Sequence, residues 1–285
     1  MPDLGAIITA IVTPFGDDGR VDEDGFVRLL KHLSANGSDG AVVAGTTGEA
    51  STLDDDEHLA LIELAVEEAP DGFSIIAGAG SNDTRHAVKL TASASELGAD
   101  AILSVTPYYN RPNRRGVLCH YEEVAKSTDL PIVLYNIPSR TGLDMPNDLL
   151  AELAQIENIV GVKQANNDNL AMVDGLQLYA GNDDVLAKVL DLGGSGGILV
   201  ASHIVGTEMR RMVDEPDERA SINENLQAVF EALSVAPAAI STKAALEMLG
   251  LPGGKPRLPY VEADESERAK IRTMLEARGL VGVTT

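Results

Sequence analysis

Residues 132–136 (IVLYN) and 159–163 (IVGVK) are two short apolar runs, separated by a helical segment at 146–155 (PNDLLAELAQ). Neither run alternates between apolar and polar residues over its length. Continuous apolar runs are typical of parallel strands that are buried on both faces of a sheet. A strand, a helix and a second strand in this order predict a right-handed βαβ unit.

The same alternation of strand and helix extends in both directions from this unit. We predict eight strands, at 7–13, 40–44, 74–78, 101–106, 132–136, 159–163, 177–180 and 197–201. Helical patterns lie between them at 23–35, 54–69, 84–97, 115–128, 146–155 and 184–192. No glycine-rich dinucleotide fingerprint follows the first strand, which weakens the alternative of an open doubly wound sheet.

After the eighth strand the pattern becomes purely helical, with segments at 205–213, 217–233, 236–249 and 265–278. The first of these completes the alternation, and a loop rich in Pro and Gly at 252–259 interrupts the rest. The sequence therefore predicts an α/β fold, a (β/α)₈ TIM barrel with a C-terminal helical appendage. We expect a catalytic barrel domain at 1–214 and a three-helix extension at 215–285 that packs on the barrel.

The composition excludes several classes of function. With 44 acidic and 22 basic residues, the net charge is −22, and such a surface repels nucleic-acid phosphates. The sequence contains no stretch of about 18 uncharged apolar residues, so we expect no membrane span. Residues 1–5 lack the basic region and long apolar run of a secretory signal, so we expect none. Cys119 is the only cysteine, which fits a reducing cytoplasm. The acidity fits either adaptation to high salt or an ordinary solvated surface.

In a TIM barrel the C-terminal ends of the strands converge on one mouth, so reactive groups at those ends are the candidates for chemistry. Thr46 and Thr47 follow the second strand between glycines, where hydroxyls and backbone N–H groups can hold a carboxylate. Tyr108 and Tyr109 follow the fourth strand, although packing alone would also explain them. Arg140 lies in the loop after the fifth strand, where it could grip a carboxylate or form a loop salt bridge.

Lys163 ends the apolar run of the sixth strand. A buried lysine is costly unless it is paired or neutral, and loss of water lowers its pKa. The free amine is what a Schiff-base nucleophile requires. The alternative is a lysine that reaches solvent at the rim of the barrel.

The sequence predicts no metal site. Its five histidines (His32, His58, His86, His120 and His203) are scattered, without the spacing of metal ligands, and we interpret each as a surface or helix residue. The glycine-rich segment 193–197 could cradle a phosphate, but we interpret it as a tight turn between a helix and a strand.

Four motifs in order, each at a strand end, resemble the dihydrodipicolinate synthase and N-acetylneuraminate lyase family. They are GTTGE at 45–49, PYYNRP at 107–112, YNIP at 135–138 and GVK at 161–163. The resemblance implies that Lys163 forms an imine with pyruvate and that Tyr135 donates and accepts protons. It implies that Thr46 and Thr47 hold the pyruvate carboxylate, and that Thr47 and Tyr109 connect Tyr135 to solvent as a proton relay.

The resemblance also implies partners for this site. The tyrosine that matches Tyr109 comes from a neighbouring subunit in this family, so we expect a homotetramer, a dimer of dimers. Gly181 and the backbone of Ile198 are expected to face the substrate. The implied enzyme uses two small molecules, pyruvate and an aldehyde, and no metal, cofactor, nucleic acid or membrane.

Arg140 is the discriminating residue for the aldehyde. The sequence YNIPSRTG at 135–142 resembles the synthases, where this arginine holds the carboxylate of L-aspartate-4-semialdehyde in the diaminopimelate route to lysine. Asn182 and Gln164 depart from the usual synthase pattern, which leaves other aldehydes open. The alternatives are another pyruvate aldolase, such as a 2-keto-3-deoxy sugar acid enzyme or N-acetylneuraminate lyase, and a non-catalytic sensor of 2-oxo acids.

Feedback inhibition by lysine is a separate expectation from the same resemblance. Tyr108, Asn82 and His58 match positions that bind lysine between two subunits of regulated synthases. Asp55 and His86 do not match, and His86 replaces a glutamate that would hold the ammonium group of the inhibitor. We therefore expect lysine inhibition to be weak or absent.

Overall fold

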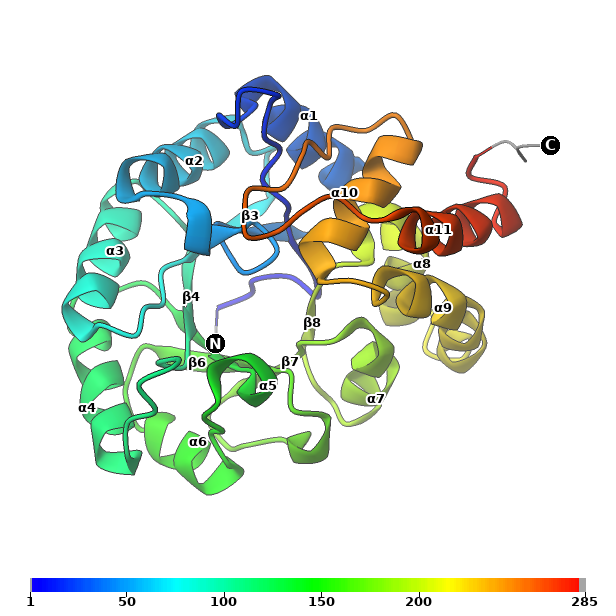
Figure 1. Cartoon of the computed structure of the whole chain (residues 1–285). Coiled ribbons are helices and arrows are strands. Elements are labelled where there is room, and N and C mark those ends of the chain that lie inside the picture. The colour runs from blue at the N-terminus through cyan, green and yellow to red at the C-terminus, as the bar shows by residue number, and fades with distance from the viewer. Residues whose placement is uncertain (1, 282–285) are drawn as a thin grey trace.

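A computed structural model describes residues 2–281, and its centre is a closed barrel of eight parallel strands in the order of the sequence (Figure 1). The first strand pairs with both the second and the eighth, which closes the barrel. The predicted TIM barrel is confirmed. The strands are β1 (Ile7–Ala10), β2 (Gly40–Val43), β3 (Ser74–Gly78), β4 (Ala101–Val105), β5 (Ile132–Asn136), β6 (Ile159–Gln164), β7 (Gln177–Ala180) and β8 (Gly196–Leu199).

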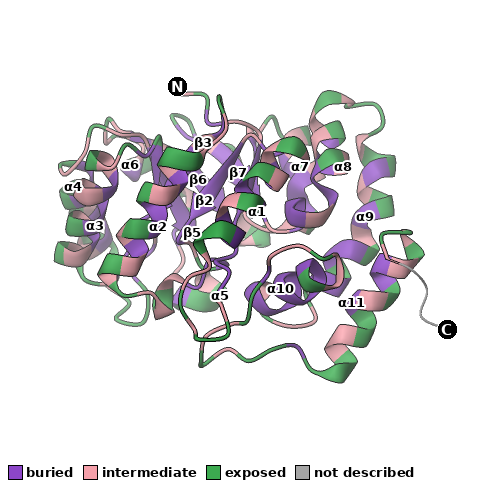
Figure 2. Cartoon of the chain, turned by 90° about the horizontal axis from the view of Figure 1, so that it is seen from above, coloured by how far each residue is buried: buried purple, intermediate pink, exposed green. Residues whose placement is uncertain are grey.

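Helices surround the barrel, and their outer faces are exposed while their inner faces are buried against the strands (Figure 2). Those of the barrel are α1 (Glu23–Ala35), α2 (Asp55–Glu68), α3 (Thr84–Glu96), α4 (Arg114–Ala125), α5 (Pro138–Thr141), α6 (Asn147–Leu153), α7 (Leu186–Asp191) and α8 (Ser202–Asp214). The appendage contains α9 (Arg219–Leu233), α10 (Ala238–Met248) and α11 (Glu265–Ala277), gathered on one side of the ring beside α8 (Figure 1).

Local capping determines where several helices begin. The carboxylate of Asp54 accepts the backbone N–H of Glu57, and the Glu57 side chain accepts the N–H of Asp54. This capping box satisfies two N–H groups that the helix itself leaves free. Asp22 and Asp83 cap α1 and α3 with single bonds of the same kind. The acidic first turn of α2 also complements the helix dipole.

Successive residues of each strand belong to two different cores. On β5, Val133 and Tyr135 pack inside the barrel, whereas Ile132 and Leu134 pack outward in the layer beneath the helices. This alternation follows from the two-residue period of a strand. It brings Tyr135 to the inner face of the barrel at the C-terminal end of β5, and Lys163 lies beside it on β6 in the paired register.

The structure corrects several predicted boundaries. The first strand ends at Ala10 rather than at residue 13, because only Ile8 to Ala10 pair with β2. The last strand is Gly196–Leu199, and the helix predicted at 205–213 lies within α8 (Ser202–Asp214), which is kinked at Val205, with a φ of −121° and a ψ of 32°. The single turn α5 was not predicted, and it carries Arg140.

The appendage packs closely on the rest of the molecule. Every residue of α10 from Ala239 to Leu246 is buried, so this helix has no solvent face along that stretch. The predicted boundary at residues 214 and 215 stays a prediction. Among the described residues, no single helix is long and apolar enough to cross a membrane, while α9 and α10 meet the length and composition criteria together, with a bend of 105° between them.

Candidate active site

A cavity of about 640 Å³ opens at the mouth of the barrel, where the C-terminal ends of β5, β6 and β7 meet the appendage. Groups from the barrel form one wall, and α9 and the start of α10 form the other. Polar side chains that line the cavity include those of Thr46, Thr47, Tyr135, Arg140, Lys163, Asp183, Gln227, Glu231 and Ser234. Gly181 lines it as well.

Lys163 is buried, with 5% of its surface exposed, and it lines this cavity. Its Nζ lies 4.2 Å from the centre of the Tyr135 ring. Burial lowers the pKa of Lys163 to about 8; the Asp183 carboxylate acts in the opposite direction, and the Arg140 cation lowers it further. The lysine therefore does not extend to solvent at the rim, which was the alternative interpretation.

Tyr135 is the other buried group at the floor of the cavity. Burial raises its pKa to about 12, while the Arg140 cation and a hydrogen bond with the Thr46 side chain act to lower it. At neutral pH the phenol therefore keeps its proton. A phenol with a hydroxyl on one side and an amine on the other can pass a proton between them.

The threonine turn, residues 45–49, brings two hydroxyls to this cavity. Its backbone bonds are short-range: the N–H of Glu49 donates to the Thr46 carbonyl over 3.1 Å, and that of Ala50 donates to the Gly45 carbonyl over 3.2 Å. A Cβ on Gly48 would lie 3.1 Å from the Ile11 carbonyl oxygen, which explains glycine there.

The two threonines of this turn differ in their surroundings. Thr46 is exposed in the isolated chain, and its side chain is the one that acts to lower the pKa of Tyr135. Thr47 is buried, with 6% of its surface exposed, although it also lines the cavity. The resemblance places Thr47 in the relay next to Tyr135, and that role stays a prediction; Thr46 is the threonine whose side chain acts on the pKa of Tyr135.

Asp183 is a member of the site that the sequence did not single out. Its Oδ1 accepts the backbone N–H groups of Val200 and Ala201, over 3.0 and 2.9 Å. Burial raises its pKa, and the two N–H donors and the Lys163 cation act to lower it. The signal in the sequence was the polar segment GNDD at 181–184, which follows the seventh strand and resembles the synthase pattern.

Arg140 reaches the cavity from α5 and is exposed in the isolated chain. None of the described residues forms an ion pair with it, so the structure does not contain the alternative loop salt bridge. A guanidinium without a carboxylate partner at a cavity wall is available for an anionic ligand.

Of the remaining candidate residues, one lines the cavity and two do not. Gly181 lines the cavity, and a Cβ there would lie 2.8 Å from the Gln164 carbonyl group. Ile198 is fully buried in the core inside the barrel and does not line the cavity. Tyr109 does not line it either. Its side chain is 89% exposed, and its backbone has a φ of 72°, an uncommon left-handed conformation for tyrosine.

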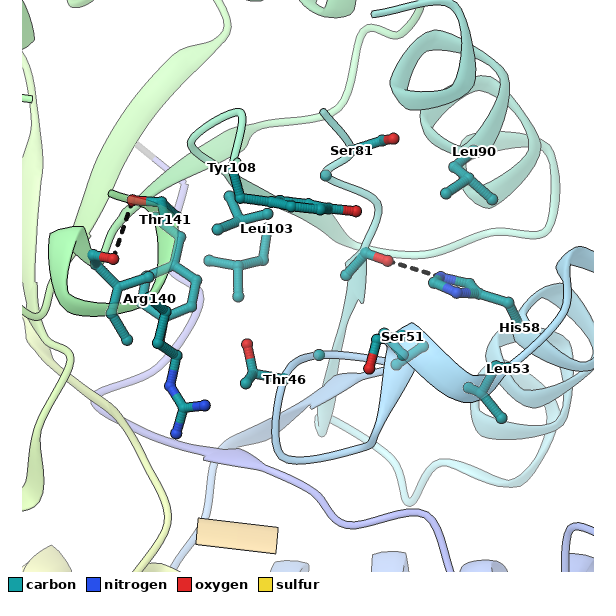
Figure 3. A pocket seen from close by; sticks show the side chains of 18 of the residues that line it. Thr46, Ser51, Leu53, His58, Ser81, Leu90, Leu103, Tyr108, Arg140 and Thr141 are labelled. Atoms are coloured by element: carbon teal, nitrogen blue, oxygen red, sulfur yellow. Dashed lines mark hydrogen bonds between the residues drawn. The ribbon is translucent and has the colours of Figure 1, made fainter. Parts of the chain in front are cut away.

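A second cavity of about 330 Å³ adjoins the first and shares Thr46, Tyr135 and Arg140 with it. Figure 3 shows Thr46 and Arg140 on one side of this cavity and His58 with Leu90 on the other. Tyr108 lines it between them. His58 is bonded to the carbonyl oxygen of Gly78 over 2.7 Å, and burial lowers its pKa.

Near this second cavity, Asp55 pairs with His86 over 2.9 Å and with Lys89 over 2.6 Å. All five histidines lie on helices, and His58, His120 and His203 are buried there rather than on the surface. Within residues 2–281, no group of His, Cys, Asp and Glu is arranged to hold a metal ion.

Comparison with known proteins gives one consistent result. The sequence model of the Dihydrodipicolinate synthetase family matches residues 3–278. A 4-hydroxy-tetrahydrodipicolinate synthase of Halalkalibacterium halodurans is 40% identical, over 94% of this chain and 95% of its own.

Two crystal structures have the same fold. The dihydrodipicolinate synthase of Cyanidioschyzon merolae with lysine bound is 39% identical, with a TM-score of 0.94, over 98% of this chain and 99% of its own. That of Acinetobacter baumannii complexed with pyruvate is 36% identical, also with a TM-score of 0.94, over 98% and 100% of the two chains.

Proposed function

The chain belongs to the dihydrodipicolinate synthetase family, and we propose that it condenses pyruvate with L-aspartate-4-semialdehyde to form 4-hydroxy-tetrahydrodipicolinate, a step of lysine biosynthesis. The single observation that carries the chemistry is Lys163. It is a buried amine with a pKa of about 8, and it lies at the floor of a cavity with a phenol and an arginine.

The first step joins Lys163 to pyruvate. The neutral amine attacks the C2 carbonyl carbon, and the resulting carbinolamine loses water to give an imine. The carbonyl oxygen must gain protons and the nitrogen must lose one for this water to leave. Tyr135 supports the step because its phenol stays protonated at neutral pH and lies beside the lysine.

The threonine turn supplies the contact for the carboxylate of pyruvate. Backbone N–H groups and hydroxyls in a tight turn are suitable donors to an anion of this size. We assign the hydroxyl of the proton relay to Thr46, because its side chain is the one that acts on the pKa of Tyr135, and leave Thr47 to hold the carboxylate.

The second step forms the carbon–carbon bond. The imine cation accepts the electron pair released when the pyruvate methyl loses a proton, and the enamine that results attacks the aldehyde carbon. Arg140 supports an aldehyde that carries a carboxylate, since no described residue pairs with it. Glu231 is on α9, in the opposite wall, and forms no ion pair with any residue in 2–281, which suits an aldehyde that carries an ammonium group.

Tyr109 supports the proposed assembly. An almost fully exposed tyrosine that does not reach its own cavity supports its use in the site of a neighbouring subunit. We therefore propose a homotetramer built as a dimer of dimers, acting in the cytoplasm, in which the barrel of residues 1–214 carries the chemistry and residues 215–285 complete the cavity.

The direct test is turnover of pyruvate with L-aspartate-4-semialdehyde, with the product followed by a coupled reductase. Turnover supports the synthase. If there is none, borohydride reduction in the presence of pyruvate distinguishes the alternatives. An adduct on Lys163 would support an aldolase that uses another aldehyde, such as the substrate of a sugar acid enzyme or of N-acetylneuraminate lyase. Absence of an adduct would favour a non-catalytic sensor.

A further inference from the structure

A buried ion pair connects the appendage to the threonine turn. Lys243, in the middle of α10, has 2% of its side chain exposed, and Glu49, the last residue of the turn, has 1%. Lys243 Nζ lies 2.5 Å from Glu49 Oε1. The mechanism described above uses neither residue, and neither lines the cavity with Lys163.

The surroundings of this pair fix the lysine from several sides. Its ammonium also donates to the carbonyl oxygen of Lys255 over 3.0 Å, and it lies 4.4 Å from the centre of the Phe15 ring. The Arg257 guanidinium lies 4.1 Å from the same ring, and its backbone N–H donates to Glu49 Oε2 over 2.9 Å. Both carboxylate oxygens of Glu49 therefore face groups from the C-terminal part of the chain.

Stability alone does not explain such a pair. Two charges lose their water on burial, and well-packed apolar side chains in their place are often as stable or more so. The pKa of Lys243 reflects this cost, because burial lowers it while Glu49 acts in the opposite direction. The neighbours of Lys243 on α10 from Ala239 to Leu246 are all buried, so an apolar residue would suit the helix.

Glu49 is the point where the pair can act on the site. Its backbone is left-handed, with a φ of 57°, and its N–H donates to the Thr46 carbonyl over 3.1 Å. The preceding Gly48 carbonyl accepts the Thr13 hydroxyl over 2.7 Å. The turn thus depends on a few bonds at its C-terminal end, and the carboxylate of Glu49 attaches that end to α10.

We propose that Lys243 is a positioning residue, which through Glu49 holds the threonine turn in the conformation that binds the pyruvate carboxylate. The inference rests on the proposed function, since it takes pyruvate as the ligand of the turn. The appendage then contributes to the binding of pyruvate, in addition to forming the cavity wall that contacts the aldehyde.

The experiment compares Lys243→Met with the double variant Glu49→Gln/Lys243→Met in the full-length protein. The readout is the pyruvate concentration that gives half-maximal borohydride-trapped adduct, beside thermal unfolding. Lys255→Met is the control, because the Lys255 side chain pairs with Asp17 at the surface. We expect both test variants to need roughly tenfold more pyruvate and the control to need the unaltered amount.

The double variant separates positioning from stability. It leaves no uncompensated buried charge, so the unfolding temperature should recover while the pyruvate requirement stays raised. An unchanged pyruvate requirement in the double variant would overturn the inference, even if the single variant fails to fold. Absence of any pyruvate adduct in the unaltered chain is a different result, which overturns the proposed function itself.

Discussion

The pKa of Lys163 makes a quantitative prediction about how fast the protein reacts with pyruvate at each pH. Only the neutral amine is nucleophilic, so the rate follows the deprotonated fraction. With a pKa of about 8, roughly a tenth of Lys163 is neutral at pH 7. A lysine at the ordinary value of 10.5 would be neutral in only about 0.03% of molecules, so burial increases the reactive form about 300-fold.

The assay is the initial rate of adduct formation with pyruvate, trapped by cyanoborohydride and measured by mass spectrometry of the intact protein. Raising the pH from 7 to 8 should increase the rate about fivefold, and raising it from 8 to 9 by less than about twofold. A lysine of ordinary pKa would give about tenfold for each pH unit over the whole range. A rate that still rises tenfold between pH 8 and 9 would refute the argument from burial.

The substitution Asp183→Asn tests the charge that opposes this effect. The carboxylate of Asp183 raises the pKa of Lys163, so its removal should move the midpoint of the rate profile to lower pH. Asparagine keeps an Oδ1 that can accept the N–H groups of Val200 and Ala201, so the loop should retain its conformation. A midpoint that stays in place or moves to higher pH would show that Asp183 does not act on the amine.

Three further predictions concern the other parts of the site. Arg140→Ala should raise the KM for the aldehyde by about 10- to 100-fold, from the loss of a charge-assisted contact of about 1.5–3 kcal/mol; an unaltered KM would exclude Arg140 from aldehyde binding. Pyruvate adduct formation should change little at pH 9, which is above the pKa of Lys163, although loss of the Arg140 cation raises that pKa. Tyr109→Phe should lower kcat and leave the mass of the assembly, measured by sedimentation, at that of the unaltered protein. An unchanged kcat would show that the Tyr109 hydroxyl is not part of the relay. Lysine should inhibit turnover weakly, because Asp55 and His86 pair with each other beside the second cavity, and strong saturable inhibition would contradict this.

The architecture could be predicted from the sequence because the strands of a barrel are buried on both faces. Continuous apolar runs such as IVLYN at 132–136 therefore indicate both the strand and its burial, and β5 matches that range. The ends of other strands were less predictable. Residues 11–13 are as apolar as β1 and equally buried, but they lie beyond the last residue that pairs with β2. Only the register of the strands shows where the pairing ends.

The candidate site was predictable where a residue ends a strand and less so elsewhere. Lys163 and Tyr135 follow apolar runs, so their place at the mouth could be inferred, and the structure brings them together. The choice between Thr46 and Thr47 depends on which way a short turn faces. Lys243 gave no signal, because a lysine on a helix is normally solvated and only the packing of α10 on its surroundings buries it.

The two walls of the main cavity come from parts of the chain that are separate in sequence. The reacting phenol and lysine belong to β5 and β6, while Glu231 belongs to α9, which follows the last strand, and Ser234 comes directly after that helix. Recombination between relatives at the end of α8 would therefore exchange one wall and leave the other intact. Such a hybrid would keep its nucleophile and Arg140 but acquire a different second wall, provided that the donor also supplied a lysine to pair with Glu49. The share of selectivity that the second wall contributes is therefore separable from reactivity, and a single crossover could transfer it.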